Sequence, residues 1–279
     1  MMKAKIILIF KGMVVGLGKI IPGVSGAMLA ITLGIYDKCI YAISNFTKNL
    51  KDNMNLLFYI GIGLILSIGL FSNLVIFLLN NHYFVTMCFF IGLIIGGIPK
   101  LYSESQINVK KLSNIFFIIV SFVIILMLNS FNPGHIIKTE ANFLTLIYIG
   151  FLESFAMIVP GISGTALLML IGYYDLVILR FSQIFNILSL VETIKFFIPF
   201  GIGMLIGVII MSKIINICFK KYQIETYCVI LGLILSSIYI LITDIYEITL
   251  NFKLYLYGFI FIIIGGFISY FLEHLMHNK

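Results

Sequence analysis

The chain of 279 residues is 61% hydrophobic and only 10% charged, which excludes an ordinary soluble globular domain. Apolar stretches of about 20 residues recur along it, the length that crosses a bilayer as an α-helix, whereas a membrane β-barrel would show short alternating segments. The formal net charge of +7 is a topology signal and a possible contact with anionic lipid, because the lysines cluster in particular loops. We therefore expect an all-α polytopic membrane protein that binds membrane lipids and no nucleic acid.

The first apolar stretch is interrupted by Ile21-Pro22-Gly23-Val24-Ser25-Gly26, between runs at 6–21 and 27–46. Proline lacks a backbone N–H and collides with the preceding turn, so a helix should end there. Ser25 then stands where a helix restarts, the position whose hydroxyl can cap free N–H groups. The pattern predicts two half-helices separated by a break at membrane depth.

The rest of the chain follows one plan twice. Three apolar runs come after the first break, at about 56–79, 84–101 and 112–131, and a polar connector covers 133–142. In the second half, runs at 143–159 and 165–187 flank Val159-Pro160-Gly161-Ile162-Ser163-Gly164, and three more runs follow at 196–218, 225–243 and 254–272.

Individual residues also match between the halves. Gly12, Gly34, Tyr36 and Asp37 pair with Gly150, Gly172, Tyr174 and Asp175 at an offset of 138, and Thr86, Cys88 and Gly92 pair with Thr226, Cys228 and Gly232 at an offset of 140. We expect residues 1–132 and 143–279 to form two repeats within one membrane domain.

The lysines predict the orientation. If each broken pair is a hairpin that enters and leaves by one face, Lys48, Lys111 and Lys220 share the side of the N-terminus, which the positive-inside rule makes cytoplasmic. Each half then crosses an odd number of times, so the halves are inverted, as is common in secondary transporters. Six spans with two re-entrant hairpins and both termini cytoplasmic are expected, and ten full spans are the alternative.

An interrupted helix inside lipid exposes N–H groups, which together with the helix dipole favour an anion. The alternative is that proline and glycine only kink or pack helices here. Ionisable residues inside apolar runs are costly and usually face a cavity or a partner. Lys19 and Arg180 could neutralise an anion, although Arg180 could also snorkel to the interface. Glu153 could carry a coupling proton or pair with one of them. The expected binding residues are Lys19, Pro22, Gly23, Ser25, Gly26, Glu153, Pro160, Gly161, Ser163, Gly164, Thr165 and Arg180.

We expect no catalytic residue, metal site, cofactor or removable signal peptide. The four cysteines, Cys39, Cys88, Cys218 and Cys228, lie in or beside apolar segments without metal-ligand spacing, so reduced packing residues are expected. Only five apolar residues lie between Lys5 and Lys11, and no cleavage-site pattern follows them.

Two motifs carry a resemblance to a known family. The stretch from Gly18 to Gly26, followed by Leu33-Gly34-Ile35-Tyr36, resembles the first signature of the bacterial polyprenyl-phosphate transporters of the PopT type. The stretch from Pro160 to Gly164, followed by Gly172-Tyr173-Tyr174, is similar to the second. Ala27-Met28 depart from the Gly and Thr expected after the first Ser-Gly, so the first motif lacks a hydroxyl that Thr165 keeps in the second.

The resemblance implies a multi-pass protein of the bacterial cytoplasmic membrane. Such a flippase would move undecaprenyl phosphate from the outer to the inner leaflet, recycling the carrier lipid of cell-wall synthesis. Its partners would be the polyprenyl-phosphate substrate and a coupling proton or sodium ion. The sequence leaves the coupling ion, the oligomeric state and the prenyl length open.

Two other functions compete with lipid transport. Membrane undecaprenyl-diphosphate phosphatases also have inverted repeats and a Pro-Gly-x-Ser motif, but they require an arginine just beyond that serine and paired glutamates. Here Gly26-Ala27 and Gly164-Thr165 follow the serines, which makes Ser25 and Ser163 poor nucleophiles. A transporter or channel for a small anion is the third possibility.

Overall fold

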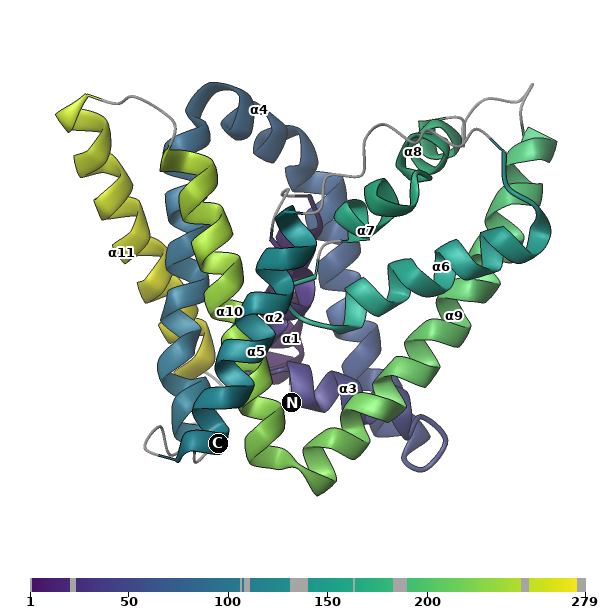
Figure 1. Ribbon diagram of the computed structural model, residues 1–279, viewed down its shortest axis with the longest axis horizontal. Coiled ribbons are helices and arrows are strands. Elements are labelled where there is room, and N and C mark those ends of the chain that lie inside the picture. Colours follow the sequence, from purple (N-terminus) through teal and green to yellow (C-terminus); the bar gives the residue numbers. More distant parts are fainter. Residues whose placement is uncertain are drawn as a thin grey trace.

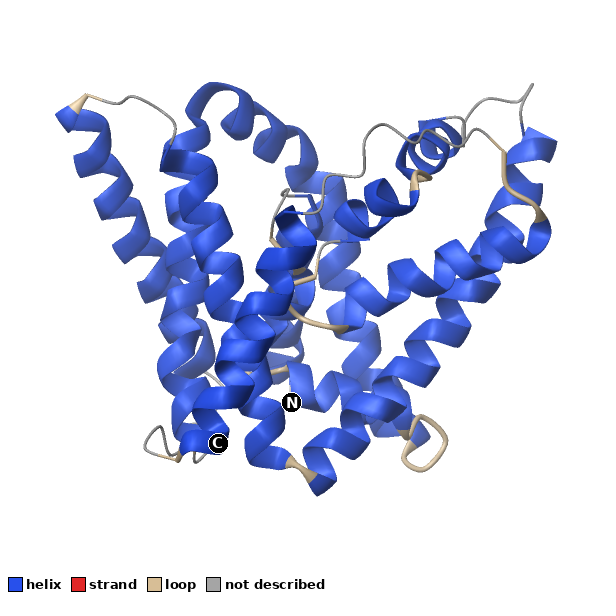
Figure 2. Ribbon diagram, in the orientation of Figure 1, coloured by secondary structure: helices blue, strands red, loops and turns tan. Residues whose placement is uncertain are grey.

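The computed structural model describes residues 2–20, 24–105, 107, 111–130, 140–162, 164–182, 190–246 and 251–274. Helices make up its regular structure throughout these ranges (Figure 2). In chain order they are α1 (Met2–Ile20), α2 (Gly26–Thr32), α3 (Tyr36–Ser44), α4 (Leu50–Ser105), α5 (Leu112–Ser130), α6 (Phe143–Ile158), α7 (Gly164–Ile171), α8 (Tyr174–Ser182), α9 (Leu190–Lys221), α10 (Gln223–Tyr246) and α11 (Phe252–His274).

Helix α4 consists of two arms, because His82 leaves helical geometry at φ −138° and ψ 41°. Figure 1 shows the C-terminal arm of α4 beside α10 and α11, while α6, α7, α8 and α9 lie on the other side of the molecule. Helices α1 and α2 lie between these two groups.

Five helical segments of the described chain are long and apolar enough to cross a membrane: Leu50–Phe71, Phe77–Ser103, Val191–Lys221, Gln223–Tyr246 and Phe252–Phe271. Helices α2 and α3 pass the same test as one pair bent by 115°, which makes them a broken span or a re-entrant loop. Shorter apolar helices cover Leu112–Leu128 and Phe143–Ile158. The expected all-helical, multi-pass membrane protein is confirmed.

Both predicted interruptions are present. Helix α1 ends at Ile20 and α2 begins at Gly26, with Ser25 extended at φ −90° and ψ 129°. Helix α6 ends at Ile158, and α7 begins at Gly164. Gly161 lies between them with φ +80°, a left-handed conformation that favours glycine. The chain therefore breaks at the two Pro-Gly stretches, as the proline rule predicts.

A second bend follows each break, and the sequence prediction missed it. The runs 27–46 and 165–187 were each expected to form one half-helix, but each contains two helices. Gly34 and Gly172 have φ values of 64° and 79°. The N–H of the residue after each glycine bonds back to a carbonyl of the preceding helix, from Ile35 to Ala30 at 3.0 Å and from Tyr173 to Leu168 at 2.9 Å. This is the Schellman ending, and the Gly-x-Tyr sequence is its local signal.

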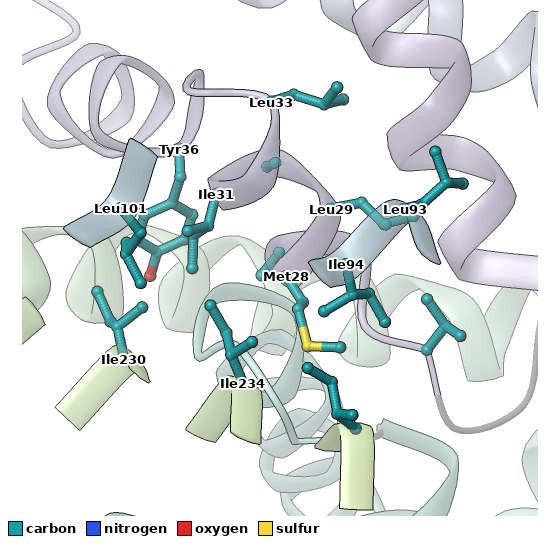
Figure 3. Packing of buried hydrophobic residues seen from close by; sticks show 14 of the residues in the cluster. Met28, Leu29, Ile31, Leu33, Tyr36, Leu93, Ile94, Leu101, Ile230 and Ile234 are labelled. Carbon is teal, nitrogen blue, oxygen red and sulfur yellow. The ribbon is translucent and has the colours of Figure 1, made fainter. Parts of the chain in front are cut away.

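Helix α2 forms the centre of the hydrophobic core. All seven of its residues are buried. Figure 3 shows Met28 and Leu29 of α2 beside Leu93 and Ile94 of α4, with Ile234 of α10 facing Met28 from the other side. Helix α2, which follows the first break, therefore packs between α4 and α10.

Within each half, glycines allow two helices to approach to backbone contact, and the two halves use equivalent positions. A Cβ added at Gly12 of α1 would lie 2.2 Å from the carbonyl oxygen of Ile60 in α4. A Cβ added at Gly150 of α6 would lie 2.0 Å from the carbonyl oxygen of Phe200 in α9. The same approach recurs between Gly63 and Ile9, and between Gly203 and Ile147. Helix pairs α1–α4 and α6–α9 therefore pack through equivalent positions.

We predict that Gly150→Ala lowers stability, because the new methyl group would collide with backbone that cannot move aside. The expected loss is about 2 kcal/mol of unfolding free energy, typical of overpacking. Gly201→Ala is the matched control, since nothing lies within 4 Å of its added Cβ. Thermal unfolding in detergent should show a lower midpoint for Gly150→Ala alone. Equal midpoints for the two variants would contradict the α6–α9 packing.

Candidate functional site

The first break is a close crossing of two backbones. A Cβ added at Gly18, near the end of α1, would lie 3.2 Å from the Cα atom of Gly26, the first residue of α2. Ser25 is the N-cap of α2 and is only 9% exposed. Its carbonyl oxygen accepts the first helical bond from the N–H of Leu29 at 3.2 Å, but its hydroxyl makes no capping bond. The predicted cap position is confirmed, whereas the side-chain cap is not formed.

The second break has an acidic side chain at its restart. The carboxylate of Glu153 in α6 lies against Gly164, where an added Cβ would be 2.3 Å from Oε2 and 2.4 Å from Oε1. A carboxylate is stabilised at the N-terminal end of a helix by the helix dipole. Pro160 is buried, and a Cβ at Gly161 would lie 2.9 Å from the carbonyl oxygen of Leu233 in α10. Glycine at 164 therefore makes room for the Glu153 carboxylate.

A hydrogen bond joins the two halves at the second break. The hydroxyl of Tyr36, the first residue of α3, donates to the carbonyl oxygen of Ile158 at 2.7 Å. Ile158 is the last residue of α6, so its carbonyl lies among those a helix end leaves without an intrahelical partner. Tyr36 is 4% exposed, and its ring meets Phe219 of α9 edge-on at 6.2 Å. The Gly-x-Tyr motif of the first half thus satisfies the backbone of the second break.

Arg180 lies in a different place. Its Nη1 atom is 2.8 Å from Oε2 of Glu192, and both residues line a pocket of about 660 Å³ together with Glu140 and Lys195. Leu146 of α6 also lines this pocket. Twelve residues of helix separate Leu146 from Ile158, which is roughly 18 Å at 1.5 Å per residue. The pocket holds charges of both signs and is separate from the breaks.

The sequence analysis did not predict two polar contacts of α2 and α3. Lys11 of α1 is 1% exposed, and its ammonium donates to the carbonyl oxygen of Leu33 at the C-terminal end of α2. A cation is favourable at that end of a helix. The position of Lys11 inside an apolar run was the sequence signal for such a contact. Tyr227 of α10 donates to Oδ2 of Asp37 at 2.7 Å, which ties α3 to α10.

The described residues thus place Ser25 and Gly26 at the first break, and Glu153, Pro160, Gly161 and Gly164 at the second. Pro22, Gly23 and Ser163 lie outside the described residues, as do the side chains of Lys19 and Thr165. Within the described ranges, no group of three His, Cys, Asp or Glu side chains could hold a metal ion.

The fold and these breaks define a multi-pass helical membrane protein with paired interruptions. A family model of undecaprenyl phosphate translocase-like proteins matches residues 15–251 and 182–276. A polyprenyl-phosphate transporter of Staphylococcus aureus (strain NCTC 8325 / PS 47) is 30% identical over 247 residues, covering 86% of this chain and 87% of the relative. A polyprenyl-phosphate transporter of Vibrio cholerae serotype O1 is 29% identical over 244 residues, covering 82% of this chain and 74% of the relative.

No solved structure matches the chain. The chain belongs to the undecaprenyl phosphate translocase-like family. The resemblance inferred from the two Pro-Gly signatures is confirmed.

We predict that Tyr36→Phe destabilises the protein by about 1–3 kcal/mol, because it leaves the Ile158 carbonyl without its hydroxyl donor. Tyr148→Phe is the matched control, since Tyr148 is 54% exposed on α6. The thermal unfolding midpoint in detergent should fall for Tyr36→Phe and stay constant for Tyr148→Phe. An unchanged midpoint for both would show that the bond contributes nothing to the folded state.

Proposed function

We propose that this protein is a lipid transporter that moves undecaprenyl phosphate from the outer to the inner leaflet of the bacterial cytoplasmic membrane. The two relatives are named polyprenyl-phosphate transporters, and the family model has a translocase description. The structural observation that carries the proposal is the hydrogen bond from Tyr36 to Ile158, which ties the first half to the second break. Two interrupted helices joined in this way suit a headgroup site shared by both halves.

The proposed headgroup site consists of the two breaks. Lys19 would supply positive charge, while Ser25 and Gly26 of the first break would offer a hydroxyl and backbone amides. Ser163, Gly164 and Thr165 would do the same at the second break, with Pro22, Gly23, Pro160 and Gly161 holding the chain open. Glu153 lies where a phosphate would bind, so the two negative groups would compete for the end of α7.

For Arg180 we propose a peripheral contact. Together with Lys195 it would meet the phosphate in the charged pocket at the other end of α6, before the headgroup reaches the breaks. Its pairing with Glu192 would have to open for a forked contact with phosphate.

We also propose that the two repeats are inverted and support alternating access. The equivalent glycine contacts of α1–α4 and α6–α9 support a two-fold relation between the halves. Further support comes from the last helix of each half, α5 and α11, which packs against a helix of the other half. A Cβ at Gly92 of α4 would lie 2.2 Å from the carbonyl oxygen of Ile262 in α11, and one at Gly232 of α10 would lie 2.3 Å from that of Ile118 in α5. Each half therefore packs its last helix against the other half.

Liposomes test transport directly. Undecaprenyl phosphate in the inner leaflet is protected from an impermeant phosphatase added outside, and the reconstituted protein should expose it. Lys19→Glu and Ser25→Ala should slow this exposure by about tenfold or more, the effect of losing one charge-assisted or buried polar contact. Ser212→Ala is the control, because the buried Ser212 hydroxyl donates to the carbonyl oxygen of Ile209, in its own helix, at 3.1 Å.

Equal slowing in the Ser25→Ala and Ser212→Ala proteins would contradict the assignment of the site. If the purified protein itself released phosphate from undecaprenyl diphosphate with sustained turnover, the phosphatase alternative would replace transport. Flux of a soluble anion without lipid substrate would favour the small-anion alternative.

Cysteine labelling tests the proposed orientation. In a background without the four native cysteines, an impermeant thiol reagent should label His82→Cys from outside intact cells and leave Lys221→Cys unlabelled. The same rule predicts labelling at positions 80, 81 and 137 and none near 50 and 106; positions 137 and 106 lie outside the described residues. Labelling of Lys221→Cys from outside would reverse the assignment of cytoplasmic termini.

A further inference from the structure

A groove lies at the elbow of α4, on the face that this helix shares with α1 and α11. Its volume is about 660 Å³, which falls within the range of roughly 300–1,000 Å³ that small-ligand sites occupy. Leu74 and Leu78 come from the N-terminal arm of α4, Val85 from the C-terminal arm, and Phe261 from α11. His82, which leaves helical geometry, joins the two arms, and side chains of both arms line the groove.

The groove opens sideways, toward lipid. Leu74 is 48% exposed and Phe261 is 39% exposed, and both belong to helices with the apolar character of the membrane interior. Val75 and Phe90, which also line the groove, are 4% and 3% exposed and form its floor. A groove with an apolar floor and lipid-facing rims takes hydrocarbon.

Polar groups occur at the elbow end. Thr86 lies there, and its hydroxyl donates to the carbonyl oxygen of His82 at 2.8 Å, so it is already satisfied within α4. The imidazole of His82 and the phenol of Tyr257 are the remaining polar side chains among the described lining residues. This lining does not suit a phosphate group, which needs several donors or positive charges.

The inner end of the groove reaches the first break. Leu17 of α1 lines the groove, and the next residue is Gly18. An added Cβ at Gly18 would lie 3.3 Å from the backbone N of Gly26, where α2 begins. Leu17 therefore places this end of the groove beside the crossing of α1 and α2, where the headgroup is proposed to bind.

We propose that this groove holds the first part of the prenyl chain of the lipid whose phosphate occupies the first break. The assignment rests on the proposed function, because it takes the headgroup position from it. The groove is too small for a long polyprenyl chain, so the remainder stays in the bilayer. The groove thereby binds the hydrocarbon part of the lipid, while the breaks bind its phosphate.

Tryptophan fluorescence tests the groove, because the chain contains no tryptophan of its own. Leu74→Trp places a reporter on the rim. Leu70→Trp is the matched control, one turn earlier on the same arm at a position that is 65% exposed and outside the groove. Both variants are placed in nanodiscs made with brominated phosphatidylcholine, which quenches an indole in contact with lipid.

Added undecaprenyl phosphate should relieve quenching saturably in Leu74→Trp and leave Leu70→Trp unchanged. Geranyl phosphate, which has the same headgroup and a short chain, should give less relief. In addition, Leu78→Trp should lower the affinity for undecaprenyl phosphate by roughly tenfold while changing that for geranyl phosphate less.

The two proposals fail in different ways. If the unmodified protein binds undecaprenyl phosphate but quenching in Leu74→Trp stays constant, or changes as much as in Leu70→Trp, the groove assignment is overturned and transport stands. If the unmodified protein binds no undecaprenyl phosphate, the proposed function falls and the groove assignment falls with it.

Discussion

A backbone that is interrupted inside lipid must find partners for its free N–H and C=O groups, because no water is present to supply them. The rest of this structure follows from how that requirement is met. At the second break, the Tyr36 hydroxyl donates a hydrogen bond to the Ile158 carbonyl oxygen, and the Glu153 carboxylate lies at the first residue of α7. In the first half, the Lys11 ammonium donates to a carbonyl oxygen at the C-terminal end of α2, while the Ser25 hydroxyl makes no capping bond at its N-terminal end. The Lys11 contact supplies a partner for the C-terminal end of the buried helix α2.

The two halves share a scaffold and differ in charge. Glycines at equivalent positions set the helix pairs, and glycines at positive φ end the half-helices in both. The charged residues close to the breaks, by contrast, occur once. At the 138-residue offset, Lys11 corresponds to Ile149, Lys19 to Met157 and Glu153 to Val15. The first break therefore has basic residues nearby and the second an acidic one. Two breaks of unequal charge would bind a phosphate with unequal affinity.

Local chemistry explains what the sequence could predict. Proline has its effect within one turn, and both interruptions fall where a glycine follows it, at Pro22-Gly23 and Pro160-Gly161, whereas Pro99 and Pro199 lie inside α4 and α9. The spans follow from apolar length. The bends at Gly34 and Gly172 have an equally local signal, which the Gly-x-Tyr pattern contained. The bond between Tyr36 and Ile158 joins residues 122 apart in sequence, and the ion pair of Arg180 with Glu192 depends on how α8 meets α9. Such contacts depend on helix crossings that no local pattern encodes.

The central claim is that a phosphate binds where the two interrupted helices restart. A structure of the protein with undecaprenyl phosphate bound measures this most directly. The account predicts the phosphorus atom within hydrogen-bonding reach of Ser25, Gly26 or Gly164, with the Glu153 carboxylate displaced if the headgroup lies at Gly164. A headgroup held by Arg180 and Lys195 in the charged pocket, with both breaks closed over apolar side chains, would contradict it.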